Sequence, residues 1–445
     1  MKKFESYRDI PQEVIEELLA PGYGPMEFGD VMLEDGTVYS STYARFPYAK
    51  GYMIDWWFSS YLKNTTNYQF WSPDHGTFEW ADNKKPGTTI GGTHISKETF
   101  GTLENGAVIT KYTLTNRHGL KASFTDLGGI WLEMWVPDKH GTLTDVVLGY
   151  DEPEKYLHQD AHFGEIVGRN ANRIGSATCT IDGITYALVI NDNGVNNLHS
   201  GPDFLRNRIW DAEVSETENG TKITFSLFSP DGDQNYPGNA DIRVSYTLTN
   251  ADEIRIDYHM TCDEDTIANF TNHAYFNLAG QASGSAMHQK VWIDADQFTI
   301  ADQYSIPTGE LVPVKGTPMD FKTLKSIDQD IEADYEPLKF AGGYDHNWVL
   351  NHKEGELALC AKAVDEASGR VMEVCTDLPG IQFYTGNFLS PMEGKEKAVY
   401  DKRQGYCFET QYFPDAVNKP QFASPILKGG DIYSTTTIYK FKTEA

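Results

Sequence analysis

The chain has 445 residues, of which 40% are hydrophobic, 13% aromatic and 23% charged. This composition excludes intrinsic disorder, a collagen helix and a coiled coil, and the length predicts two or three domains, or one large all-β domain with something smaller. Sixty-four acidic against 37 basic residues give a formal net charge of −27 at pH 7. Because such an acidic surface repels phosphate backbones and anionic lipids, we expect neither nucleic acid nor a membrane among the partners.

Cysteine usage indicates a reducing compartment. The five cysteines are odd in number and widely spaced, and they include no CxxC pair. Neither a disulfide framework nor a structural zinc site fits this pattern. The sequence also contains no run of ~18 apolar residues that would span a bilayer, and no apolar segment follows the charged N-terminus. We therefore expect a cytoplasmic protein without a signal peptide.

The first 95 residues differ in composition from the rest. Aromatic side chains crowd the stretch from Tyr43 to Trp80. Pro11 in a first turn and the dipeptide Pro21-Gly22 at the end predict one helix over residues 11–20. The polar segment 81–87 predicts a turn or short linker. We therefore expect two domains, an aromatic-rich α+β module at 1–95 and a second domain at 96–445.

Short segments with strict alternation dominate the sequence after residue 95. Apolar and polar residues alternate at 222–227, 242–248 and 254–259. This pattern predicts antiparallel strands that cover a core on one side. Further strands are expected at 108–114, 121–126, 130–136, 358–364 and 436–441, with a short helix at about 153–158. The predicted fold class is mainly β, a large antiparallel β-sandwich behind the small α+β module.

Three polar clusters lie where strands should end. Segment 168–174 holds two arginines and two asparagines, which either bind hydroxyl oxygens or hydrogen-bond their own backbone in an ordinary loop. Segment 196–202 contains His199, and segment 269–278 places Thr271, His273 and Tyr275 on one face of a strand. A single histidine is more often structural, but two asparagine-rich segments that each carry one favour a site.

Three more clusters follow in the last quarter of the chain. They are 343–348 with Asp345, 379–388 with Gln382, and 406–415 with Glu409. Apolar and aromatic neighbours flank Glu409, and desolvation would raise its pKa towards that of a usable general acid or base. The alternative is an ordinary edge-strand glutamate that points into water.

Together these clusters have the composition of a pocket for a neutral sugar. Amides, carboxylates and guanidinium groups bind hydroxyls, and aromatic faces cover C–H surfaces. A serine or cysteine nucleophile, a metal cluster and a phosphate loop of the GxxxxGK or GxGxxG type are absent from the motifs.

At these motifs the chain resembles the aldose 1-epimerase (galactose mutarotase) family, from about Lys97 to the C-terminus, most specifically at 269–278, 344–347 and 409–414. The resemblance implies an antiparallel β-sandwich, no cofactor and no metal, and interconversion of the α and β anomers of hexoses such as galactose and glucose. It also implies a monosaccharide as the partner and leaves open whether the protein is a monomer or a homodimer. Matched position by position, it implies that Glu409 is the general base and His273 the general acid, and that the sugar is held by Asn172, Arg173, His199, Tyr275, Asp345 and Gln382.

The N-terminal module is similar to part of the diacetylphloroglucinol hydrolase family, at 53–58, 68–75 and 93–98. That resemblance implies a metal-dependent C–C hydrolase with a helix-grip fold. His75, His94 and Glu98 are candidate ligands, but the other segments of such a site are missing, so we expect a packing or gating module. Two alternatives remain at this point, a sugar-binding or sugar-sensing protein without catalysis and a bifunctional enzyme. Retention of both Glu409 and His273 favours an enzyme, because binding alone needs neither.

Overall fold

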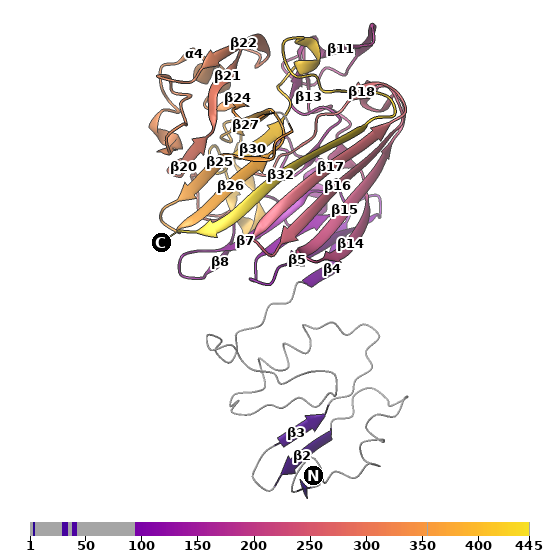
Figure 1. Cartoon of the computed structure of the whole chain (residues 1–445), viewed down its shortest axis with the longest axis vertical. Coiled ribbons are helices and arrows are strands. Elements are labelled where there is room, and N and C mark those ends of the chain that lie inside the picture. The colour runs from indigo at the N-terminus through magenta and orange to yellow at the C-terminus, as the bar shows by residue number, and fades with distance from the viewer. Residues whose placement is uncertain (1–2, 5–28, 34–37, 42–93, 354, 445) are drawn as a thin grey trace. The chain divides into compact units, whose positions relative to one another are not determined.

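A computed structural model describes residues 3–4, 29–33, 38–41, 94–353 and 355–444 (Figure 1). The chain divides into two compact units, Met1–Ile90 and Gly91–Ala445. In the first unit, strands β1 (Lys3–Phe4), β2 (Gly29–Leu33) and β3 (Val38–Ser41) form one sheet, with β1 parallel and β3 antiparallel to β2. The helix predicted over 11–20 and the aromatic stretch lie outside the described residues.

The second unit is built around one long antiparallel sheet of nine strands. Their order is β14 (Asp211–Thr217), β15 (Gly220–Ser229), β16 (Ala240–Thr249), β17 (Glu253–Cys262), β32 (Ile432–Thr443), β26 (Arg370–Thr376), β25 (Ala358–Asp365), β20 (Lys290–Ile293) and β23 (Lys325–Ser326). The last strand of the chain, β32, lies between β17 and β26 in the middle of this sheet (Figure 1, yellow). It thereby joins the earlier and later halves of the unit into one sheet.

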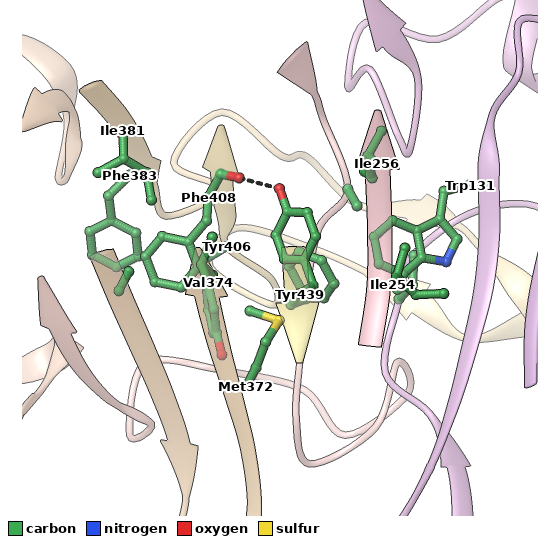
Figure 2. Close-up of a cluster of buried hydrophobic side chains, with 14 of the residues drawn as sticks. Trp131, Ile254, Ile256, Met372, Val374, Ile381, Phe383, Tyr406, Phe408 and Tyr439 are labelled. Atoms are coloured by element: carbon green, nitrogen blue, oxygen red, sulfur yellow. Dashed lines mark hydrogen bonds between the residues drawn. The ribbon is translucent and has the colours of Figure 1, made fainter. Parts of the chain in front are cut away.

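Two five-stranded sheets pack against this long sheet. One has the order β4 (His94–Thr102), β5 (Val108–Thr115), β6 (Lys121–Thr125), β7 (Trp131–Pro137) and β8 (Leu143–Asp145). The other has the order β22 (Pro307–Pro313), β21 (Ala295–Ala301), β24 (Asp345–Leu350), β27 (Gly380–Tyr384) and β30 (Cys407–Gln411). Tyr439 of β32 touches both, because its ring lies 5.6 Å from that of Trp131 and its hydroxyl donates to the Phe408 carbonyl at 2.6 Å (Figure 2). The predicted β-sandwich is confirmed.

Short elements connect the sheets. The paired two- to four-residue strands are β9 (Ile166–Val167) with β19 (Thr271–Asn272), β10 (Arg173–Ile174) with β13 (Asn197–Leu198), β11 (Thr178–Ile181) with β12 (Ile184–Ala187), β18 (Thr266–Ile267) with β31 (Ile426–Leu427), and β28 (Met392–Glu393) with β29 (Val399–Tyr400). Among the described residues the α-helices are α3 (Pro153–Leu157), close to the predicted 153–158, and α4 (Glu336–Ala341). Neither they nor any other helix among the described residues has the length and apolarity to cross a bilayer.

The core lies between the sheets, and the alternation read from the sequence builds it. Along β17, Ile254, Ile256, Tyr258 and Met260 are buried while the residues between them are partly exposed. Figure 2 shows Ile254 and Ile256 beside the Trp131 ring. Each such side chain contributes about 1.5–3 kcal/mol when it is removed from water, which makes the alternating register strongly preferred over a one-residue slip.

The strand expected to carry Thr271, His273 and Tyr275 is shorter than predicted. Strand β19 ends at Asn272, because the following residues pair with different segments. His273 exchanges backbone hydrogen bonds with residues 164 and 165, whereas the Tyr275 carbonyl accepts from Leu148. The alternation nevertheless keeps the rings of His273 and Tyr275 together, with centroids 5.2 Å apart.

Candidate active site

Strands β24, β27 and β30 have one apolar face and one polar face. Ile381, Phe383 and Phe408 point into the core (Figure 2). Since successive side chains of a strand point to opposite faces, residues one position away lie on the other side of the sheet. The candidate site therefore lies on the face of this sheet that points away from the core. The alternation that directs the apolar side chains into the core also directs the polar side chains to the site.

The register across these strands aligns the polar residues in rows. Asn347 of β24 lies opposite Gln382 of β27, and Gln382 lies opposite Glu409 of β30. In the next row Asp345 lies opposite Tyr384. The Gln382 amide donates to Asp345 Oδ1 at 2.7 Å, which links the two rows. Segments 343–348, 379–388 and 406–415 thus converge on one surface, as their composition suggested.

Glu409 and His273 form the centre of this surface. Oε1 of Glu409 lies 3.7 Å from Nε2 of His273, and the two residues are 2% and 4% exposed. Strand β30 is at the edge of its sheet, yet Glu409 does not face water, so the alternative of an ordinary edge glutamate is wrong. Its second oxygen, Oε2, is buried and has no hydrogen-bond partner among the described residues.

His273 is held by its backbone and by its ring. Its N–H donates to the Glu165 carbonyl and its carbonyl accepts from Gly164, both at 3.0 Å. Its Nδ1 lies 3.6 Å from Sγ of Cys407. The other ring nitrogen, Nε2, therefore faces Glu409.

His199 and Asn172 are joined by β10 and β13. Arg173 pairs with Leu198 in this ladder, which places the preceding Asn172 beside the following His199. The His199 N–H donates to the Asn172 carbonyl at 3.0 Å, and the Asn172 N–H donates to Nδ1 of His199 at 3.2 Å. Because Nδ1 accepts, the proton of the neutral imidazole is on Nε2, and His199 presents a hydrogen-bond donor.

Arg173 and Tyr275 complete the predicted set. The Arg173 side chain donates through Nε to Asp192 Oδ2 at 3.1 Å, which leaves its terminal nitrogens for other acceptors. The Tyr275 ring lies 5.8 Å from that of Tyr384 and 5.2 Å from that of His273. The structure therefore brings the six other predicted residues together around the Glu409–His273 pair.

Burial disfavours the charged form of both central groups. Burial and the negative charge of Asp345 raise the pKa of Glu409 well above its usual value, although Arg173 opposes this shift. Burial and the neighbouring His162 lower the pKa of His273 to about 3, with Glu165 acting in the opposite direction. A proton shared by the two therefore resides on the carboxyl rather than on the imidazole.

Burial and nearby charges also shift the pKa values of the neighbouring groups. Burial and the surrounding histidines lower the pKa of His199 well below its usual value, so its neutral tautomer persists at neutral pH. Burial raises the pKa of Asp345, while Arg173 and the Gln382 amide act against it. Arg173 is thus the cation that counters both carboxyl groups of the site.

His199, His273 and Glu409 offer three atoms within 4.8 Å of one another, a spacing that a metal ion could bridge. The tautomer of His199 argues against this use, because an imidazole whose Nδ1 already accepts a hydrogen bond has no lone pair left on neutral Nε2. The set fits hydroxyl binding and proton transfer better than metal coordination. Of the N-terminal candidates, His75 lies outside the described residues and Glu98 pairs with Lys111 at 3.6 Å.

Several residues of the site were not selected from the sequence. Asn347 and Gln411 have buried amides without partners among the described residues, on the same face as Glu409. The sequence could have revealed them, because Asn347 and Gln411 each lie two residues after a predicted site residue, Asp345 and Glu409 respectively, and so share its face of the strand. Conversely, the Arg169 guanidinium is fully buried and donates to Ser229, Pro237 and Gly238, so in segment 168–174 the structural interpretation holds for this arginine.

Comparison with known proteins places this geometry in a family. The family model described as aldose 1-epimerase matches residues 110–440, and the DAPG hydrolase PhiG domain matches residues 10–126. A galactose mutarotase from Sus scrofa is 41% identical over 349 residues, 78% of this chain and 98% of that protein.

Two further relatives agree. The aldose 1-epimerase of Escherichia coli K12 is 35% identical over 78% of this chain and 99% of that protein. The crystal structure of an aldose epimerase homologue from C. elegans has a TM-score of 0.67 and 27% identity, covering 80% of this chain and all of that one. The family match, the identities and the shared sandwich lead to one conclusion: the chain belongs to the aldose 1-epimerase family of isomerases.

Proposed function

We propose that the protein interconverts the α and β anomers of hexoses such as galactose and glucose, with Glu409 and His273 as the proton-transfer pair. The observation that carries this proposal is the 3.7 Å approach of the Glu409 carboxyl to Nε2 of His273 in a buried site. Ring opening removes a proton from O1 and delivers one to O5, two oxygens on the same carbon. A carboxyl and an imidazole side by side match this demand.

The proton balance closes over one full cycle. Glu409, as the carboxylate, takes the proton of the C1 hydroxyl while His273, as the imidazolium, gives a proton to the ring oxygen, the C1–O5 bond breaks and the C1=O1 double bond forms. This starting form is one proton shift, from Glu409 to His273, away from the distribution that burial favours. The aldehyde then rotates about C1–C2, and the reverse transfers close the ring on either face. In the open-chain state the pair is a neutral carboxylic acid beside a neutral imidazole, the distribution that burial favours. The site therefore stabilises the protonation state that accompanies the intermediate.

The remaining residues supply hydroxyl contacts. His199 presents an N–H donor, Arg173 presents the guanidinium nitrogens not used by Asp192, and Asp345 and Gln382 offer oxygens. The unpartnered amides of Asn347 and Gln411 add donors and acceptors on the same face. Each buried polar atom without a partner has an unmet hydrogen bond, which a sugar hydroxyl would satisfy.

Galactose is the first sugar to test, because relatives named galactose mutarotase align over most of the chain. The five free cysteines, four of them buried, support a reducing compartment such as the cytoplasm. We propose that the protein acts there on free monosaccharides, as a monomer or a homodimer.

Polarimetry tests the proposal. Freshly dissolved α-galactose and α-glucose, with xylose and maltose for range, are followed with and without the purified full chain. We expect the approach to the equilibrium rotation to accelerate in proportion to enzyme concentration. If none of the four sugars equilibrates faster than its spontaneous rate, the proposed function is wrong.

A further inference from the structure

A second cluster of titratable groups lies directly behind the catalytic pair, formed by His162, Glu165 and Arg206. Glu165 is 1% exposed and Arg206 4%. Nδ1 of His162 hydrogen-bonds Oε1 of Glu165, and Nη1 of Arg206 donates to Oε2 of Glu165 at 3.0 Å. The mechanism above uses none of these side chains, although burying two charged groups is costly unless they serve a purpose or are well paired.

These bonds determine the protonation of Glu165. Burial acts to raise the pKa of Glu165, but the attraction of His162 and Arg206 outweighs it and lowers the pKa to about 2. Glu165 is therefore an acceptor only, and Nη1 of Arg206 also lies 2.9 Å from Nδ1 of His162. Arg206 is fixed in turn, because its Nη2 donates to the Gln159 carbonyl at 2.8 Å and its guanidinium lies 4.1 Å from the Phe204 ring.

The cluster touches the catalytic histidine at two places. The Gly164–Glu165 backbone exchanges both hydrogen bonds with His273. The His162 ring lies 5.5 Å from the His273 ring and 4.8 Å from that of His199. One short segment, 162–165, thus holds the backbone of His273 and also packs against its imidazole.

The cluster also sets the charge around the pair. His162 and Arg206 both disfavour protonation of His273, whereas Glu165 favours it. Glu165 in addition disfavours ionisation of Glu409. The other titratable or polar groups that face His273 are His199, Glu409, Tyr275, Tyr384 and Cys407.

We propose that His162, Glu165 and Arg206 are positioning residues that align His273 with Glu409 and set the pH range in which this pair holds a single proton. The proposal rests on the proposed function, since it assigns a role in that reaction. It predicts that Glu165→Gln and His162→Gln move the pH profile in opposite directions, because these two residues act oppositely on His273.

The test compares pH profiles of kcat for the full-length chain and its variants. The Glu409–His273 pair is active when it holds one proton, so the pH profile of kcat is bell-shaped. The apparent pKa values of its acid and basic limbs belong to the coupled pair rather than to either residue. Glu165→Gln removes a negative charge and should move both limbs to lower pH by about one unit. It should lower kcat about tenfold and leave KM within about twofold, because the side chain that fixes the His162 ring against His273 is changed while the sugar contacts remain.

His162→Gln should act in the opposite direction. It removes the neighbouring imidazole that lowers the pKa of His273, so the acid limb should move to higher pH by about half a unit to one unit. The double variant Glu165→Gln/His162→Gln should return the acid limb close to its original position. Asp145→Asn is the matched control, because it removes a buried carboxylate that pairs with Lys395. It should leave both limbs unmoved.

The proposal is overturned if Glu165→Gln and His162→Gln shift the acid limb in the same direction, or if neither shifts it. If Glu165→Gln does not fold, the direction of the shift in His162→Gln alone decides. If the unmodified protein shows no mutarotation, the proposed function fails and a readout without substrate is used. The ¹³Cε1 resonance of His273, assigned with His273→Asn, should then titrate at higher pH in His162→Gln than in the unmodified protein, and equal midpoints would refute the role of the cluster.

Discussion

Replacement of Glu409 by glutamine is the most informative single change in this protein. The amide has the shape of the carboxyl, and the site around it is closed, with 2% of the residue exposed. It cannot exchange a proton with O1 at neutral pH, and a positioned proton-transfer group contributes about 10²–10⁴-fold to a rate. We therefore expect kcat to fall by that factor, about 3–5 kcal/mol of barrier. KM should change little, because the sugar is held mainly by other side chains.

Stability should change in the favourable direction. The folded protein keeps the proton of Glu409 at a pH where the unfolded chain releases it, because burial and Asp345 raise the pKa of this group. The native state therefore loses stability as the pH rises above the unfolded pKa of about 4.5. Glutamine has no such dependence. At pH 7 the Glu409→Gln variant should be more stable by about 1–2 kcal/mol, and the difference should vanish near pH 4.

Glu133→Gln is the matched control with the opposite sign. Burial acts to raise the pKa of Glu133, but Lys395 and Lys111 outweigh it and the pKa is lowered. This carboxylate stabilises the fold above its unfolded pKa, and its contribution is lost as the pH falls through the folded value. Glu133→Gln should thus lower Tm at pH 7 and leave kcat unchanged.

Polarimetry on α-galactose gives kcat and KM, and differential scanning calorimetry between pH 4 and 8 gives the two Tm series. The expected signature of Glu409→Gln is a large loss of kcat together with a Tm that exceeds the unmodified value increasingly as the pH rises. If Glu409→Gln kept more than a third of the original kcat, Glu409 would not transfer the proton. A loss of activity accompanied by a lower Tm at pH 7 would show instead that the carboxyl is structural.

Three further predictions address the rest of the site. His273→Asn should lower kcat by about 10²–10⁴-fold by removing the proton source of the ring oxygen, and its effect should not add to that of Glu409→Gln, as a double-mutant cycle in polarimetry would reveal. Asp192→Asn should raise KM for galactose more than it lowers kcat, because Asp192 orients Arg173 at 3.1 Å; equal KM values in steady-state kinetics would contradict that role. Dialysis against EDTA should leave kcat unchanged, since His199 presents an N–H rather than a lone pair, and restoration of a lost activity by zinc would overturn this assignment.

The sequence alone determined the class of the fold and the chemical character of the site. Alternation at 254–259 requires one face of that segment to be buried, and β17 has this pattern. The flanking aromatics of Glu409 indicated desolvation, and the structure shows the residue buried. Such local patterns predict burial correctly because the face to which a side chain of a strand points depends only on its position along that strand.

The tertiary structure decided which polar residues meet. Asn347, Gln382 and Glu409 form a row only because β24, β27 and β30 are neighbours in one register, and strand order is not encoded in the alternation of any single strand. Strand β19 ends at Asn272 because the residues after it pair with other segments, and the local sequence pattern does not predict such a change of partner. The cluster behind His273 was invisible for the same reason. His162 and Glu165 lie in one turn and Arg206 lies some forty residues later in a short 3-10 helix, and only folding brings the three side chains within hydrogen-bonding distance.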